Sequence, residues 1–422
     1  MDDFSIVLKS LRARLFSTVT TSLTVAVAVA MLLVLLGMRD SGRQAFSRGA
    51  GNMHLLITAE SGPLQSVLNG VFYANAPDRP LRWEKYEEIA SAHPWAYTIP
   101  VQMGDSYRGM PVLATNREFF EVYEPTPGNA WALEEGRFFE DTWECVVGAQ
   151  VARETGLSVG DEISLTHGTG QTGEGHVHDE FVFEVVGVAE LTGSPHDRAL
   201  FAPLEASWVL HAHDRRLAEN PDADVTTIDD IGPTDKLITG IYARVFTRPG
   251  RASTSALQQV HYRLRTDPTI MVASPSVQTS KLLNIVSNID QIFLAMAAIV
   301  LLSSGIAIML ALYNSMEQRR RQIAVLRVLG CSRRRIFGIV MTESAMLGLA
   351  GAIAGGLVAF VGAEIVANVM KARLGLVIDA SVGLRWILFT VVATVLLASL
   401  AGVIPAMMAY RTSVARALRP LG

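Results

Sequence analysis

The sequence has few cysteines and few charges, and it lacks the common nucleotide-binding loop. Two cysteines, Cys145 and Cys331, are too few for a disulfide framework. Charged residues make up only 18% of the 422 residues, less than in a typical soluble protein, whereas hydrophobic residues make up 50%. No Gly-Lys dipeptide occurs, which excludes the loop Gly-x-x-x-x-Gly-Lys-Ser/Thr. The sequence contains no basic, aromatic-rich segment of the kind that binds nucleic acid.

Four long hydrophobic runs are present instead. A helix needs roughly 20 mostly apolar residues to cross a bilayer core of about 30 Å, and three of the four runs carry no charge at all. The first run is longer than the core of a signal peptide, so we expect it to remain as an anchor. The predicted membrane helices are residues 16–38, 277–313 (crossing from about 292), 337–366 and 386–410.

The distribution of Lys and Arg predicts the orientation of these helices. Residues 1–15, 314–336 and 411–422 together hold thirteen basic and three acidic residues. We therefore expect these segments and both termini on the cytoplasmic side of the membrane. Residues 39–276 and the short loop 367–385 are then expected outside.

Residues 39–276 are typical of a globular domain, either one elongated domain or two small lobes. A glycine-rich loop, 168–175, separates two strand-like segments, 162–167 and 180–191, as in a long hairpin. Further strands are expected at 53–58, 145–148, 199–202, 237–245 and 270–273, and helices at 80–90, 149–155 and 254–264. The predicted fold class is an integral membrane α-helical protein with four transmembrane helices and a mixed α/β extracytoplasmic domain between helices 1 and 2.

Two further helical features lie at the membrane edges. Residues 277–313 contain no Gly or Pro before Gly305, so we expect one continuous helix of about 55 Å whose first part forms a stalk outside the membrane. Residues 1–15 place apolar side chains at helical spacing beside basic ones. They are either an amphipathic helix on the membrane surface or an extension of the first membrane helix.

The third predicted membrane helix contains small residues and an acid, Glu343, near one end. Gly351 and Gly355 are four residues apart, a spacing that allows close helix approach, either within one chain or in a dimer. Glu343 lies near the cytoplasmic end, where a carboxylate is costly unless it is paired. We expect it to pair with a nearby arginine such as those at 333–335.

Several motifs together resemble a known family. An arginine-rich segment follows the second membrane helix, Thr342-Glu-Ser344 opens the third, and the chain ends in Gly402-Val-Ile-Pro405 followed by a basic tail. The outer segment contains Gly136-Arg-Phe138, Val146-Val-Gly148, Gly156-Leu-Ser-Val-Gly-Asp161 and Phe183-Glu-Val-Val-Gly187. Over essentially the whole chain these motifs resemble the FtsX-like and MacB-like permeases of ABC transporters, with a MacB-like core domain outside.

The resemblance implies a non-catalytic permease subunit that dimerises, as a homo- or heterodimer, with two copies of a separate ABC ATPase subunit. The chain itself needs no cofactor, because ATP is bound by the partner. Movement of the cytoplasmic segment would pass to the outer domain, a process called mechanotransmission, for export or extraction of a substrate. Membrane lipid and a periplasmic adaptor or substrate protein are further expected partners.

The same resemblance assigns ATPase coupling to seven residues of the cytoplasmic segment and a structural role to four in the membrane. The coupling residues are Arg321, Gln322, Ile323, Leu326, Arg327, Leu329 and Gly330; the structural ones are Glu343, Gly351, Gly355 and Pro405, which closes the last helix. Gln322 stands where the family usually has Glu. Ile323, Leu326 and Leu329 recur every three residues and would enter a groove of the ATPase. Attraction of a solvated helix to anionic lipid is the alternative.

Other functions remain open at this stage. The same topology fits a regulatory transducer that activates a periplasmic hydrolase without transport, a metal-linked export or uptake component, or a passive binding protein. All nine histidines fall within 39–276. On strands, the pairs His176/His178 and His211/His213 would each share a face and could meet one Zn or Cu ion. Spacing identifies no third ligand, so no metal site is assigned.

Overall fold

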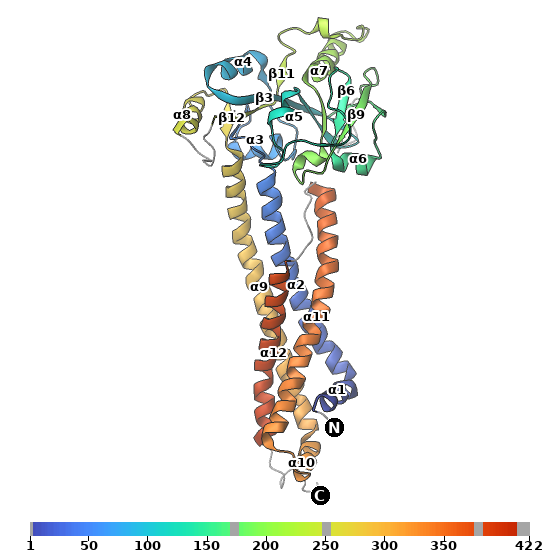
Figure 1. Ribbon diagram of the computed structural model, residues 1–422, viewed down its shortest axis with the longest axis vertical. Coiled ribbons are helices and arrows are strands. Elements are labelled where there is room, and N and C mark those ends of the chain that lie inside the picture. Colours follow the sequence, from blue (N-terminus) through green and yellow to red (C-terminus); the bar gives the residue numbers. More distant parts are fainter. Residues whose placement is uncertain (1–2, 169–176, 247–254, 375–382, 412–422) are drawn as a thin grey trace. The chain divides into compact units, whose positions relative to one another are not determined.

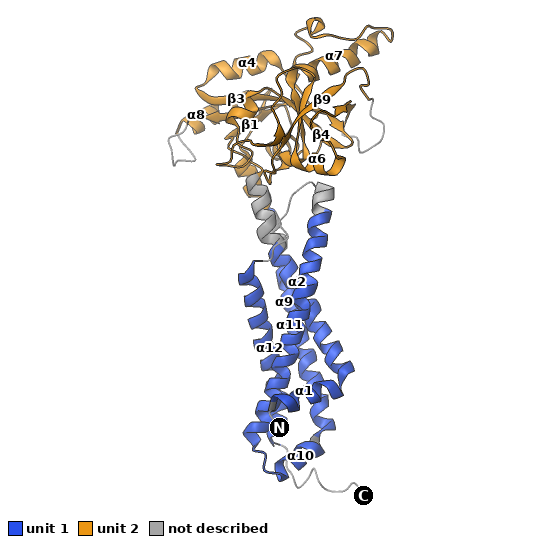
Figure 2. Ribbon diagram, turned by 45° about the vertical axis from the view of Figure 1, so that its right-hand side comes forward, with its two compact units in different colours: residues 1–42, 285–369, 378–422 blue, residues 43–284, 370–377 orange. Residues whose placement is uncertain are grey.

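The computed structural model of the chain describes residues 3–168, 177–246, 255–374 and 383–411. It divides into two compact units, coloured separately in Figure 2. We call residues 1–42, 285–369 and 378–422 the membrane unit, and residues 43–284 and 370–377 the domain unit. The segment between the first two membrane helices therefore forms one compact unit, not two lobes.

Four helices among the described residues are long and apolar enough to cross a bilayer. They are α2 (Leu15–Arg48), α9 (Pro275–Gln318), α11 (Arg333–Leu374) and α12 (Leu384–Arg411). Their apolar spans are Leu15–Gly37, Gln291–Gln318, Arg333–Val369 and Leu384–Arg411. Because each helix falls on a predicted hydrophobic run and a mixed α/β domain lies between the first two, the predicted fold class is confirmed.

Three details of these helices differ from the prediction or refine it. The helix expected from residue 277 starts at Pro275 and continues without interruption to Gln318. The loop predicted at 367–385 is helical up to Leu374, and residues 375–382 lie outside the described residues. Pro405 does not close the last helix, since α12 continues to Arg411. A proline removes one backbone hydrogen bond, and here the flanking turns hold the helix together without it.

Two shorter helices accompany the spans. In α1 (Asp3–Ala13), Val7 and Ser10 are buried while Phe4 is exposed. A turn at Arg14 separates α1 from α2, so the N-terminal segment is a helix of its own and not a continuation of the first span. The other short helix is α10 (Arg320–Val328), between α9 and α11.

The glycines of α11 lie against α2. A Cβ atom added at Gly351 would come within 2.5 Å of the Val25 Cβ, and one at Gly355 within 2.6 Å of the carbonyl oxygen of Ala26. Figures 1 and 2 show α2 and α11 running beside each other in the membrane unit. Of the two explanations for the small residues, the structure shows packing within one chain.

The domain unit is built on one mixed sheet of 11 strands in the order β13-β1-β12-β3-β4-β10-β6-β9-β5, with β7 beside β9 and β8 beside β3. The strands are β1 (Leu55–Thr58), β3 (Trp95–Tyr107), β4 (Met110–Thr115), β5 (Leu133–Gly136), β6 (Glu144–Val147), β7 (Glu162–Ile163), β8 (Thr166–His167), β9 (Phe183–Ala189), β10 (Leu200–Pro203), β12 (Gly240–Val245) and β13 (Met271–Ala273). A separate two-stranded sheet joins β2 (Leu81–Arg82) to β11 (Leu237–Ile238). Pairs β4/β10 and β6/β9 are parallel, and the others are antiparallel.

Helices cover both faces of the large sheet (Figure 1). On β10, Phe201 packs with Phe119, whereas its neighbours Leu200 and Ala202 pack with Val209, because successive side chains of a strand point to opposite faces. The helices on the Phe201 face are α3 (Pro63–Gly70) and α5 (Glu118–Val122). Those contributing to the opposite face are α4 (Trp83–Ala92), α6 (Ala149–Thr155), α7 (Leu204–Glu219) and α8 (Ser255–Leu264).

The strand predicted at 162–167 divides into two. Its first half, β7, pairs with β9 as the predicted hairpin requires, with Ile163 opposite Phe183. Its second half, β8, pairs with β3 instead, where His167 faces Asp105. One segment therefore connects two distant places in the sheet.

Candidate functional site

The sequence after α10 determines where this helix stops and the next begins. Gly330 has a φ of +93°, a left-handed conformation that glycine adopts without strain. The next amide, Cys331 N–H, donates to the carbonyl oxygen of Leu326 at 3.0 Å. The Ser332 hydroxyl oxygen accepts from the Arg335 amide at 3.2 Å and so caps the start of α11. Gly330 thus has a structural role in the turn between two helices.

One side of α10 is anchored in the membrane unit. Ile323 is only 7% exposed and packs with Met316, Ile336 and Val340. The predicted stripe of Ile323, Leu326 and Leu329 is therefore wrong as a single docking face. Because residues three apart drift around a helix by about 60°, the two ends of such a stripe point in different directions.

The opposite side of α10 presents apolar side chains to the surroundings. Val325, Val328 and Leu329 are 47%, 65% and 78% exposed, and Leu326 lies at the edge with 36%. We call these four residues the α10 face. Of the other predicted coupling residues, Arg321 and Gln322 are exposed on the same side of the helix as the α10 face. Arg327 lies on the opposite side, next to Ile323.

Val325 and Val328 were not among the predicted coupling residues. Their spacing with Leu329, at i, i+3 and i+4, is the helical signal that could have identified them. Exposed apolar side chains gathered on one helix face mark a surface for a protein partner or a membrane. The α10 face is thus the strongest candidate for docking in the described part of the membrane unit.

Glu343 is buried and paired. Its Oε1 accepts a hydrogen bond of 2.9 Å from the Ser10 hydroxyl, and its Oε2 lies 3.4 Å from Arg319 Nη1. The expected pairing with residues 333–335 is replaced by Arg319, because those residues lie about 12–15 Å earlier along the same helix. Arg14 adds a bond of 3.2 Å to the carbonyl oxygen of Ser315. Glu343 therefore ties α1 and the α9–α10 junction to α11.

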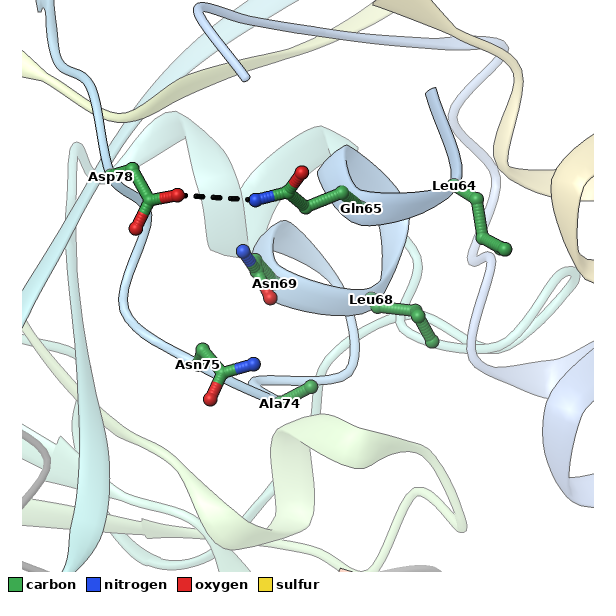
Figure 3. A pocket seen from close by; sticks show the side chains of 7 residues that line it. All are labelled: Leu64, Gln65, Leu68, Asn69, Ala74, Asn75 and Asp78. Atoms are coloured by element: carbon green, nitrogen blue, oxygen red, sulfur yellow. Dashed lines mark hydrogen bonds between the residues drawn. The ribbon is translucent and has the colours of Figure 1, made fainter. Parts of the chain in front are cut away.

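A cavity of about 390 Å³ lies beside α3 in the domain unit. Figure 3 shows its lining, in which Gln65 donates a hydrogen bond of 3.2 Å to Asp78. Behind it, buried Glu60 accepts from Asn69 Nδ2 at 3.0 Å. The lining residues are Leu64, Gln65, Leu68, Asn69, Ala74, Asn75 and Asp78. They offer amide and carboxylate groups to a polar ligand but include no nucleophile with an adjacent base.

The stretch Gly156-Leu-Ser-Val-Gly160 has the residue spacing of a hydrolase nucleophile elbow. Such an elbow needs a strand before the serine and a helix after it. Here α6 precedes the motif and β7 follows it, which is the reverse order. The Ser158 hydroxyl donates to Asp161 at 3.1 Å, with no histidine in that contact. The motif forms a surface turn, in which Gly156 ends α6 with a φ of +78°.

Of the two predicted histidine pairs, the structure contradicts His211/His213. His211 and His213 lie on α7, where residues two apart point to different sides of a helix. His213 is buried with its Nδ1 3.1 Å from the Thr226 hydroxyl, away from His211. His176 lies outside the described residues, and His178 is fully buried 3.5 Å from Asp214. The prediction that each pair shares a face assumed that the histidines lie on strands. It is wrong for His211 and His213, because they lie on α7.

Strand β6 begins with a buried carboxylate, Glu144, that pairs with half-exposed Arg137, followed by a buried thiol, Cys145. The Arg137 guanidinium donates to both carboxylate oxygens of Glu144, and the amides of Glu140 and Asp141 donate to Oε2. The Arg137 hydrogen bond is the main cause that lowers the pKa of Glu144 to about 2. Burial raises the pKa of the neighbouring Cys145 thiol, which is therefore an unreactive core residue.

Two family descriptions match the chain. Residues 18–278 match "MacB-like periplasmic core domain" and residues 294–414 match "FtsX-like permease C-terminal". The first match alone covers more than half of the chain.

Two curated relatives have similar sequences. The macrolide export ATP-binding/permease protein MacB of Wolinella succinogenes is 22% identical over 82% of this chain and 50% of its own length. An uncharacterized ABC transporter permease, MJ1507, of Methanocaldococcus jannaschii is 23% identical over 68% of this chain and 64% of its own. The chain thus spans about half to two thirds of the length of these relatives.

Two solved structures resemble the chain at low identity. The periplasmic region of MacB from Actinobacillus actinomycetemcomitans is 10% identical, with a TM-score of 0.32 over 55% of this chain and 94% of that one. The extracellular domain of the noncanonic ABC-type transporter YknZ from Gram-positive bacteria is 11% identical, with a TM-score of 0.27 over 52% of this chain and 98% of that one. Taken with the four membrane spans and the domain between the first two, the family matches establish that this multi-pass membrane protein belongs to the MacB-like, FtsX-like family of ABC transporter permeases.

Proposed function

We propose that this chain is the permease subunit of an ABC transporter whose ATPase is a separate chain, and that α10 receives the motion of that ATPase. The observation that carries the proposal is the α10 face, in which three apolar side chains on α10 and Leu329 at its C-cap are exposed, while the other side of the helix is anchored through Ile323. Such a helix can transfer force, because whatever displaces its outer face also moves the core beneath it.

Two further observations support a separate ATPase. The given residues contain no Gly-x-x-x-x-Gly-Lys-Ser/Thr loop, and we infer that a partner chain binds ATP. The Wolinella succinogenes relative is named an ATP-binding/permease protein, and this chain matches half of its length. We infer that two copies of the ATPase serve a permease dimer, homo- or heteromeric, and that the permease itself holds no cofactor.

The proposed path of motion runs from α10 through α9. The junction between these two helices is held on α11 and α1 by Glu343 with its partners Arg319 and Ser10. Beyond that junction, α9 is one uninterrupted helix up to Pro275, next to β13 in sequence. In the proposed orientation α10 and both termini are cytoplasmic at the bacterial inner membrane, and the domain unit outside meets a substrate or a periplasmic adaptor for export or extraction.

Leu329 is the residue of choice to test the ATPase contact. Because its side chain is 78% exposed, replacing it should leave the fold of the membrane unit intact. We expect Leu329→Glu to abolish co-purification of the ATPase from native membranes and the ATP hydrolysis that accompanies it. Leu329→Met, which keeps an apolar side chain at the same place, is the matched control and should retain both.

The outcome discriminates between a protein partner and lipid. If ATPase co-purifies with both variants equally, the α10 face does not bind it and the coupling assignment fails. If wild-type protein brings down no ATPase while the α10 face still binds vesicles containing anionic lipid, the face is a membrane-surface element.

A further inference from the structure

Three histidines and two aspartates that are distant in sequence meet beside β3 of the domain unit. Asp105 comes from β3, His167 from β8, and His178 from the segment that leads into β9. His211 and Asp214 come from α7. We call these five residues the His/Asp cluster. It lies apart from the α3 cavity, with which it shares no residue.

The sheet directs Asp105 and His167 to the same place. They are directly opposite each other in the antiparallel β3/β8 pair, where facing side chains lie on one side of the sheet. The register of β3 against β4 shifts by one residue between Met103 and Ser106, as it does at a β-bulge. Val101 and Met103 pack on the α5 face, whereas Asp105 reaches α7 on the other face. The bulge therefore re-aims Asp105, as bulges near functional sites commonly do.

Helix α7 supplies two further members of the cluster. His211 and Asp214 are three residues apart on α7 and so lie on the same side of the helix. The backbone of His178 is held beside β8, because its amide donates to the carbonyl oxygen of Leu165 at 2.9 Å. Four of the five members thus lie on strands or on α7, and His178 is held through its backbone hydrogen bond to Leu165.

The distances between the ligand atoms fit a metal ion in each of two triads, Asp105–His167–His211 and His167–His178–Asp214, which share His167. His167 Nδ1 lies 3.3 Å from Asp105 Oδ1 and 3.9 Å from Asp214 Oδ2. Asp105 Oδ1 lies 3.6 Å from His211 Nε2, and Asp214 Oδ1 lies 3.5 Å from His178 Nδ1. Tetrahedral ligands at about 2.0–2.1 Å from a zinc ion are about 3.3–3.4 Å apart. Within each triad that contains His167, the ligand atoms all lie within 4.8 Å of one another.

The chemistry of the donors favours a divalent transition metal. Imidazole nitrogens combined with carboxylate oxygens are typical ligands of Zn²⁺, whereas Ca²⁺ and Mg²⁺ take oxygen ligands. Two carboxylates match the charge of a divalent ion. Asp105 and His178 are buried, while the His167 side chain is 49% exposed, so the cluster has an open side through which an ion can enter.

We propose that the His/Asp cluster binds one Zn²⁺ ion, with His167 as the ligand common to the Asp105–His211 and His178–Asp214 sides. This site differs from the His-x-His pairs suggested by the sequence, since it takes one member of each pair and adds His167 and two aspartates. The inference does not depend on the proposed coupling to an ATPase, because it rests on the domain unit alone.

The test is a Zn²⁺ titration of the full-length protein, purified in detergent with a histidine-free tag and stripped with EDTA. We expect wild type to bind one Zn²⁺ per chain. His167→Ala and His211→Ala should each weaken binding about tenfold or more, the scale seen when metal sites lose supporting groups. His261→Ala, on α8 and outside the cluster, is the matched control and should bind as wild type does.

A second readout separates metal binding from folding. In EDTA, His167→Ala should remain folded and unfold at or somewhat below the wild-type temperature, because the replaced side chain is half exposed but pairs with buried Asp105. Added Zn²⁺ should raise the unfolding temperature of wild type and of His261→Ala, but not of His167→Ala. The proposal is overturned if wild type binds no stoichiometric Zn²⁺, if His167→Ala binds equally well, or if the control variant loses binding to the same extent. In each of these cases the cluster is only a set of ion pairs.

Discussion

The contact between α2 and α11 allows a test in which two adjacent glycines behave differently. A Cβ atom at Gly355 would lie 2.6 Å from the Ala26 carbonyl oxygen and 2.7 Å from the Val29 Cβ. A Cβ atom at Gly356 would meet nothing within 4 Å. Alanine has the same helix propensity at the two positions, but its side chain clashes with α2 at position 355 and meets open space at position 356.

The expected magnitude follows from this geometry. Ordinary van der Waals contact begins near 3.4 Å, so Gly355→Ala forces the two helices apart by about 0.8 Å, and the obstacle is backbone that cannot rotate away. Overpacking of this kind costs about 1–3 kcal/mol. Gly356→Ala should be neutral or stabilising by up to about 1 kcal/mol, because alanine is the better helix former.

The assay is unfolding of the purified protein by titration with SDS, followed by far-UV circular dichroism, which reports mainly on the membrane helices. Gly355→Ala should unfold at lower SDS than wild type, and Gly356→Ala at the same concentration or higher. The reasoning is refuted if both variants unfold together. If Gly355→Ala lowers only the fraction of dimer and leaves unfolding unchanged, the glycines serve contacts between chains instead.

Two other predictions follow from the polar groups. Glu343→Ala should destabilise the membrane unit by about 2 kcal/mol, since it removes charged hydrogen bonds from Arg319 and Ser10, and Glu343→Gln, which retains the bond to Ser10, should cost less in the same SDS titration. In the domain unit, Arg137 lowers the pKa of Glu144 to about 2, so this pair stabilises the fold above the ordinary glutamate pKa of about 4.5, and the contribution is lost as the pH falls from about 4.5 towards 2. Glu144→Gln should be less stable than wild type at neutral pH in urea unfolding and should lack this part of the pH dependence; equal pH profiles would contradict the assignment.

The membrane helices were predictable because a bilayer imposes a local rule. About 20 uncharged apolar residues are enough for a helix to span the bilayer core, independently of which other helices it packs against. The domain was harder. The hairpin of β3 and β4 and the helix α7 were not predicted, although β3, with 13 residues, is the longest strand described. Both strands are buried on two faces, so their sequences lack the alternation that marks a half-exposed strand.

The candidate docking site was predicted in place but not in detail. The segment containing Arg321, Leu326 and Leu329 forms a helix with an exposed apolar side, yet Ile323 belongs to the core and Val325 and Val328 replace it. Helical spacing alone cannot distinguish two apolar sides of a short helix. Which side is covered depends on α9, α11 and α12, which pack against it.

The sequence by itself determined the four membrane spans, the mixed α/β domain between the first two, and the family, because hydrophobic length and contiguous motifs are properties of neighbouring residues. Only the tertiary structure decided the partner of Glu343, the role of Gly351 and Gly355, and the membership of the His/Asp cluster. Ser10 and Glu343 are 333 residues apart, and Asp105 and His167 are 62 apart. Contacts over such separations arise from packing and strand register, which no local pattern in the chain encodes.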